Sequence, residues 1–228
     1  MTKPSGEGAD LATEQRILDV AHAVFIRAGT AGARMQEIAD EAGVNKALLH
    51  YYFRSKERLA EAVFKRAAAR VFPTILQVLG SDLEIEEKVE RVVTHYLHQL
   101  SEAPYLAGYV ICELNQHPER ITQYLRAVAM PGRDQPDEDA HGDRSRKQTR
   151  VRALDVLDKQ LRARARAGTL RAISHEQFLV NLLALCIFPF ASRPILAAML
   201  GLEDAAFRRF IAERRKELPT FFLRALQP

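Results

Sequence analysis

The sequence has few of the features that mark exported or metal-stabilised proteins. Its first dozen residues, MTKPSGEGADLA, contain no apolar core of a signal peptide. The chain has only two cysteines, Cys112 and Cys186, and both lie in apolar stretches. They supply neither a disulfide framework nor a CxxC metal knuckle. We therefore expect a cytoplasmic protein without a metal or another cofactor.

Long uninterrupted hydrophobic runs are also missing. The most apolar part, residues 178–199, is interrupted by Asn181, Pro189, Arg193 and Pro194, whereas a membrane span needs about 20 continuous apolar residues. A buried helix or a subunit interface fits this segment better than a span, so we expect no membrane partner.

Signals for β-strands and for common catalytic motifs are nearly absent. No Asn-Gly or Asp-Gly turn joins alternating β-branched runs, while Ala, Leu, Arg and Glu recur at helical spacing. The pattern predicts an all-α protein of about nine helices. We expect no enzyme, because the chain has no Gly-rich phosphate loop, nucleophile elbow or His-Glu-x-x-His pattern.

Turn and cap residues divide the chain. Helices are expected over about 13–28, 34–42 and 45–54, then from Ser55 to a kink at Pro73. Ser81 with Glu84, and Ser174 with Gln177, have capping-box spacing. Further helices are expected from Pro104 to residue 118, over 118–130, from Thr149 to Gly168 and over 204–226, with an exposed loop at 131–147.

The second and third expected helices have the spacing of a helix-turn-helix. They are joined by EAGVN, in which Gly43 permits a tight turn and Asn45 can cap the third helix. At about 100° per residue, Leu49, Tyr52 and Phe53 share an arc that can pack on the preceding helices. The other arc is polar, aromatic and small, which suits a DNA groove better than a core: Lys46, Ala47, Leu48, His50 and Tyr51.

Charge supports this interpretation locally. The net charge of +4 is modest, but residues 44–58 hold Lys46, Arg54, Lys56 and Arg58 against the single acid Glu57. Lys46 can donate to guanine or phosphate, and the rings of His50 and Tyr51 can contact the DNA backbone. A surface helix with a few exposed apolar residues is the alternative interpretation.

The stretch from 13 to 64 resembles the TetR-type (tetracycline-repressor-like) transcription regulators, most specifically in IADEAGV, LLHYYF and SKE. The resemblance implies an all-α homodimer whose three-helix head, residues 10–56, binds DNA. It also implies a body, residues 57–228, with a ligand pocket and the dimer interface. Ala33 stands where the family commonly has Thr or Ser, and His50 where it has Tyr. The DNA-binding residues carried over or inferred beside them are Arg34, Gln36, Asn45, Lys46, Ala47, Leu48, His50, Tyr51 and Lys56.

Polar residues on apolar helices of the body are the candidates for the effector pocket: His95, His98, Tyr105, Tyr109, Glu113, Tyr124 and Asn181. His95 and His98 have the helical spacing of a metal pair, and Cys112, Glu113 or His117 could complete it. Packing or orientation of a largely apolar effector is the preferred interpretation of both histidines.

The last two expected helices carry enough apolar surface for a two-fold four-helix interface. The candidate interface residues are Phe178, Leu182, Leu185, Phe188, Phe207, Phe210, Ile211, Leu218 and Phe222. The basic run 144–171 fits a solvated helix face better than a second nucleic-acid surface, with Val151, Leu154, Leu157 and Leu161 turned inward.

We thus expect a ligand-responsive regulator, most simply a repressor, that binds a palindromic double-stranded operator and releases it when a small molecule enters the body. The alternative is a helical ligand-binding or enzymatic protein whose head has lost DNA binding.

Overall fold

The computed structural model describes residues 6–108 and 140–228, and every regular element in this part of the chain is an α-helix. The all-α prediction is therefore confirmed. The helices are α1 (Gly6–Gly32), α2 (Met35–Glu41), α3 (Lys46–Phe53), α4 (Lys56–Leu79), α5 (Ile85–Glu102), α8 (Ala140–Arg166), α9 (His175–Ala191), α10 (Arg193–Leu200) and α11 (Asp204–Arg224).

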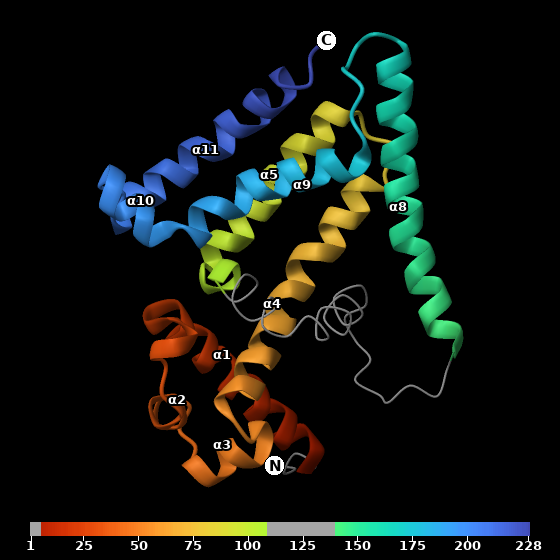
Figure 1. The fold of residues 1–228 in the computed structure, drawn as a ribbon. Coiled ribbons are helices and arrows are strands. Elements are labelled where there is room, and N and C mark those ends of the chain that lie inside the picture. Colours follow the sequence, from red (N-terminus) through yellow and green to blue (C-terminus); the bar gives the residue numbers. More distant parts are fainter. Residues whose placement is uncertain (1–5, 109–139) are drawn as a thin grey trace, which may run out of the picture.

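The first three helices form a small head around the beginning of α4 (Figure 1). Ile17 and Phe25 of α1, Ile38 of α2 and Leu49 of α3 are all almost fully buried in its core. The regular part of α1 ends at Gly29, which has a φ of 68° and a ψ of 170°. Glycine is suited to this position because a side chain would make the positive φ costly.

The α4 helix belongs to both halves of the molecule. Its first turns pack on α1, where Arg66 forms an ion pair with Asp19 at 2.9 Å. Its last turns pack on α5 and α8 (Figure 1). The helix does not end at Pro73 but continues to Leu79. Any movement of α4 is therefore shared between the head and the body.

The body is built around α5, which contacts α4, α9 and α11. Eight of its residues are buried, including Lys88, whose exposed fraction is 0%. The Lys88 ammonium donates to the carbonyl of Leu79 at 2.7 Å and to Oε1 of Gln160 at 2.6 Å. Burial lowers the pKa of Lys88, although the carboxylates of Asp82 and Glu84 oppose this shift. One side chain thus joins α4, α5 and α8.

Two local predictions about the body were wrong. The Ser81 hydroxyl donates to the carbonyl of Val78 at 2.7 Å instead of capping a helix, and α5 begins at Ile85 after Glu84, whose side chain makes no cap hydrogen bond. The loop expected at 131–147 gives way to helix from Ala140, because Arg, Lys and Gln continue the helix-favouring pattern of α8 towards its N-terminus. Residues 131–139, and the helices expected over 109–130, lie outside the described residues.

Other caps are confirmed. The side chain of Ser174 accepts a hydrogen bond from the backbone N–H of Gln177, so it caps α9. Gly168 has a φ of 68° just after the end of α8. Leu157 and Leu161 of α8 are buried and Leu154 is half-buried, as expected for a helix with one solvated face. The side chain of Val151 lies outside the described residues.

Candidate nucleic-acid interface

The turn between α2 and α3 sets the direction in which α3 leaves the head core. Gly43 has a φ of 64°, and its N–H bonds to the carbonyl of Asp40 at 3.2 Å. Two residues later, Asn45 accepts the backbone N–H of Leu48 at 2.7 Å, which confirms its role as the N-cap of α3. The first turn of α3 is thereby fixed at the surface.

The two faces of α3 are divided as the sequence predicts. Leu49 and Phe53 are buried, with exposed fractions of 0% and 6%. Tyr52 is half-buried and donates its hydroxyl to Asp10 Oδ1 at 3.0 Å; burial, followed by this hydrogen bond, raises its pKa. The opposite face carries the exposed side chains of Lys46, Ala47, His50 and Tyr51 and the half-buried Leu48.

The side chain of Tyr51 on this face is 75% exposed. Its ring meets the ring of Tyr52 edge-on, with the two centroids 5.5 Å apart. The aromatic pair therefore links the core face to the exposed face, and the outer ring is presented to solvent together with its hydroxyl, which can accept or donate.

The imidazole of His50 has a defined orientation. Its Nδ1 lies 3.0 Å from the carbonyl oxygen of Arg54, which can only accept, so Nδ1 carries the proton. Arg54 has a φ of 56°, an unfavourable value for a residue with a side chain, and this hydrogen bond supports it. The neutral ring consequently presents a bare Nε2, and only the protonated ring can donate Nε2–H to a phosphate.

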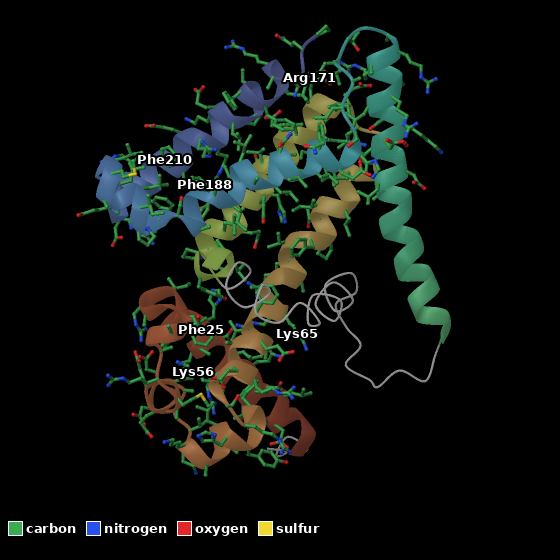
Figure 2. The ribbon with its side chains drawn as sticks, viewed as in Figure 1. Phe25, Lys56, Lys65, Arg171, Phe188 and Phe210 are labelled. Carbon is green, nitrogen blue, oxygen red and sulfur yellow. The ribbon has the colours of Figure 1, made fainter. Side chains whose placement is uncertain are left out.

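Lys56 makes hydrogen bonds within the protein that the sequence did not predict. Its ammonium donates to the carbonyl of Ala31 at 3.0 Å and to that of Ala33 at 3.4 Å, so it joins the start of α4 to the end of α1. Ser55 caps α4 by accepting the N–H of Arg58 at 3.3 Å. Figure 2 shows Lys56 within the head. Two of the three ammonium protons are therefore used inside the protein, and one remains for a phosphate.

Two of the predicted DNA-binding residues lie at the N-terminus of α2. Arg34 is the exposed N-cap residue of α2, and the Gln36 amide donates to Asp40 Oδ1 at 2.8 Å. On the other side of α2, Arg27 forms ion pairs with Glu37 at 2.9 Å and Glu41 at 2.6 Å, which hold α2 against α1. The predicted DNA-binding residues thus occupy the beginning of α2, the exposed face of α3 and the beginning of α4.

The structure describes four of the predicted pocket residues, His95, His98, Tyr105 and Asn181, and of these only His98 is a lining residue of the hollow described next. His98 lines a hollow of about 290 Å³ between α1, α4 and α5, and Tyr105 bonds to His22 of the same hollow, its hydroxyl 2.6 Å from Nδ1. His95 is not a lining residue, but it donates Nε2–H at 3.1 Å to the carbonyl of Arg70, which is one. Asn181 is on the exposed face of α9, and its assignment to a pocket stays a prediction. Tyr109, Glu113 and Tyr124 lie outside the described residues.

The hollow beside His98 is charged rather than apolar. Asp19, His22, Arg66, Arg70 and Glu102 contribute to its lining. Burial lowers the pKa of His22, and the positive charges of Arg66 and Arg70 lower it further. Such a lining does not match a largely apolar effector. Within residues 6–108 and 140–228, no group of three His, Cys, Asp or Glu side chains is arranged to hold a metal ion.

Most of the predicted interface residues face the core of their own chain. Six have exposed fractions of 0–4%, because α9 and α11 turn them towards the rest of the body: Phe178, Leu182, Phe207, Ile211, Leu218 and Phe222. Leu185 and Phe210 are half-buried, and Phe188 is 61% exposed (Figure 2). The interface prediction is therefore corrected for the six buried residues, which have no surface to offer a partner.

The exposed apolar surface of α9 and α11 lies on their other faces. Val180 and Phe188 of α9 are 63% and 61% exposed, and Phe221 of α11 is 62% exposed. Val180, Ala184 and Phe188 recur every four residues and form one outward stripe. Helical spacing alone could not choose this stripe, because α9 is apolar around most of its circumference.

The basic run on α8 is partly neutralised. Arg162 pairs with Asp158 at 2.7 Å, and Arg164 pairs with Glu84 at 3.3 Å and Glu86 at 2.6 Å. In the described part of the chain no single helix has the length and apolar character to cross a membrane. Only α9 and α10 taken together, bent by 69°, pass that test on length and composition.

Comparison with known proteins adds sequence evidence. Residues 17–63 match the model of a family described as bacterial regulatory proteins, tetR family. TtgW of Pseudomonas putida, an uncharacterized HTH-type transcriptional regulator, is 32% identical over 127 residues, which cover 50% of this chain and 92% of TtgW. The HTH-type transcriptional repressor SCO4008 of Streptomyces coelicolor is 34% identical over 122 residues, 52% of this chain and 62% of that protein.

The matches to four of the curated relatives span only 52% to 62% of those proteins' own lengths. Solved structures agree with the fold over nearly the whole chain. The fatty acid degradation regulator FadR from Bacillus halodurans superposes with a TM-score of 0.59 at 17% identity, covering 97% of both chains. A putative TetR-family regulator from Mesorhizobium loti gives 0.54 at 19% identity, covering 95% of both chains.

Proposed function

This chain belongs to the TetR family of bacterial regulatory proteins, and we propose that it is a homodimeric, ligand-responsive repressor of transcription. The observation that carries the proposal is the division of α3. Its core face is buried in the head. The opposite face, which is cationic and aromatic, is exposed and follows directly after the N-cap residue Asn45. The name of the relative SCO4008, a transcriptional repressor, supports the same assignment. The proposal includes action in the cytoplasm and no catalytic step.

In this proposal α3 enters the major groove with its N-terminal end first. Lys46 and Ala47 would meet base edges, where an ammonium can donate to guanine and a methyl group can contact thymine. Tyr51 and a protonated His50 would bind phosphate oxygens, together with Arg34 and Gln36 at the start of α2. The remaining N–H of the Lys56 ammonium would donate to a phosphate oxygen near the N-terminus of α4.

A second copy would join through the outward stripe of α9 and the exposed face of α11. Val180, Phe188 and Phe221 leave large apolar side chains at the surface, and a two-fold axis would cover each copy with the same residues of its partner. The two copies of α3 would then read the half-sites of a palindromic operator, about 34 Å apart in successive major grooves.

Ligand response would pass along α4. In the proposed division, residues 10–56 form the DNA-binding domain and residues 57–228 form the ligand-binding and dimerisation domain. The α4 helix begins at this boundary and packs on both α1 and α5. A ligand that favours one position of α4 would change the spacing of the two heads, by no more than its difference in affinity for the two states.

A mobility-shift assay with the DNA beside the protein's own gene tests the proposal. We expect sequence-selective binding that Lys46→Ala weakens, while Lys216→Ala, an exposed lysine of α11, leaves it unchanged. Failure to bind any candidate operator at low salt would instead favour a helical ligand-binding or enzymatic protein whose head no longer binds DNA.

A further inference from the structure

A second hollow, of about 540 Å³, lies where the end of α1 meets the body. It is lined by residues of α1, of the α5 end and of α9 to α11: Ile26, Arg27, Ser101, Pro104, Phe190, Arg193, Asp204, Phe207, Arg208, Ile211, Ala212 and Arg215. Its volume falls in the range of about 300 to 1,000 Å³ that is usual for small-molecule sites. His95, His98, Tyr105 and Asn181, the four predicted pocket residues that the structure describes, do not line it.

Part of the lining of this hollow is apolar. Phe190, Phe207 and Ile211 are buried, with exposed fractions of 7%, 4% and 3%, and all three are lining residues. Ile26 of α1, at 43% exposed, adds an apolar side chain from the head. The lining therefore offers a ligand hydrocarbon and aromatic side chains from both halves of the molecule.

The lining is also cationic, and only some of its arginines form ion pairs. Four arginines and one aspartate line the hollow. Arg193 pairs with Asp204 and lies over the ring of Phe207, 5.0 Å from its centroid, while Arg27 pairs with Glu37 and Glu41. Arg208 and Arg215 have no ion-pair partner within residues 6–108 and 140–228.

Arg215 also has a hydrogen-bond donor that lacks an acceptor among the residues that the structure describes. Its Nε is buried, and no acceptor in the described part of the chain bonds to it. A buried donor without a partner costs free energy, so each such group in a folded protein needs an explanation. An anion held by the Arg215 guanidinium would supply the missing acceptor, and a carboxylate can do so through two parallel hydrogen bonds.

From these observations we propose that the hollow between α1, α9 and α11 binds an amphipathic anion, an apolar molecule with a carboxylate or similar oxyanion held by Arg215. The apolar body lies over Phe207 and Ile211, and Arg208 adds positive charge two helical turns from Arg215. The proposal rests on the proposed function in treating this ligand as the effector of a regulator. In this site the effector would contact the head directly, through Ile26.

Binding is tested on the full-length protein without DNA. The chain has no tryptophan, so the aromatic sulfonate 1-anilinonaphthalene-8-sulfonate serves as the fluorescent probe, and unlabelled decanoate and decanol compete with it. We expect decanoate to displace the probe, and decanol, which has the same chain length and no charge, to be at least about tenfold weaker, as expected for loss of a charge-assisted hydrogen bond.

Arg215→Gln and Lys216→Gln form a matched pair, since both remove one positive charge from adjacent positions of α11 and only Arg215 lines the hollow. We expect Arg215→Gln to weaken decanoate by about tenfold or more and Lys216→Gln to have no effect. Arg208→Gln, at an exposed position, provides a second test with a smaller loss if Arg215→Gln does not fold.

Equal displacement by decanoate in wild type, Arg215→Gln and Arg208→Gln, or equal potency of decanol, would overturn the proposed site. The outcome is separable from that of the DNA assay. If decanoate binding depends on Arg215 but no operator is bound, the proposed function as a regulator is refuted and the proposed anion site is supported. If an operator is bound but decanoate binding does not depend on Arg215, only the proposed anion site is refuted.

Discussion

Replacement of Lys88 by methionine tests whether a buried ammonium holds the body together. The substitution keeps an unbranched apolar side chain of similar length but removes the donor to the Leu79 carbonyl and to Gln160 Oε1, at 2.7 and 2.6 Å. The Leu79 carbonyl and the Gln160 oxygen would lose their donor at a site where Lys88 itself is inaccessible to solvent. Hydrogen bonds to a charged group contribute about 1.5 to 3 kcal/mol each, and relief of the buried charge offsets part of their loss.

We therefore expect Lys88→Met to lower the free energy of unfolding by about 2 to 4 kcal/mol. Urea denaturation followed by circular dichroism measures this at one fixed protein concentration, because dimerisation makes apparent stability depend on concentration. Lys159→Met, at an exposed position of α8, is the control and should stay within about 0.5 kcal/mol of wild type. A Lys88→Met protein as stable as the control would refute the idea that the ammonium joins the three helices.

Three further predictions concern the head and its junction with the body. Asn45→Ala should destabilise the protein by about 1 kcal/mol through loss of the α3 cap, while Asn45→Asp keeps an acceptor and most of the stability in the same urea titration. Gly43→Ala should lower the free energy of unfolding by about 1 to 2 kcal/mol, because alanine is strained at a φ of 64°. An added Cβ would meet no atom within 4 Å, so no steric clash should add to this loss. A larger loss of stability would contradict this reasoning. Burial and two nearby arginines lower the pKa of His22 below 6.5, so the unfolded chain takes up its proton first as pH falls. Below about pH 6.5 the free energy of unfolding should therefore fall less steeply with falling pH in His22→Gln than in wild type. Equal slopes in the two proteins would contradict a lowered pKa of His22.

Local signals in the sequence were sufficient to predict most of the head. Gly43 and the caps Asn45 and Ser55 act on residues within three or four positions, so their effects could be inferred without knowing what packs against them. The division of α3 into two faces followed from helical geometry, because polar and apolar residues occupy different arcs. The structure adds contacts over longer separations, such as the bond from Lys56 to Ala31, which no local pattern indicates.

The body was less predictable for a physical reason. An evenly apolar helix such as α9 gives no periodic signal, so buried Phe178 and exposed Phe188 look alike in sequence. The Ser81 hydroxyl donates to the Val78 carbonyl, three residues earlier in the chain, and α5 begins only at Ile85. The hollow beside Arg215 is lined by residues of α1, α5, α9, α10 and α11, and only the folded arrangement brings these residues together.

The central claim is that the exposed face of α3 binds the phosphates and bases of an operator, and the salt dependence of binding tests it most directly. Fluorescence anisotropy of a labelled operator duplex at several salt concentrations gives the slope of log K against log salt for wild type, Lys46→Ala and Lys216→Ala. If Lys46 neutralises a phosphate, Lys46→Ala should weaken binding and make the slope less negative by about 0.9, with Lys216→Ala unchanged. If it reads a base instead, affinity falls with an unchanged slope and operator preference relaxes. Equal affinity, slope and operator preference in all three proteins would contradict the account.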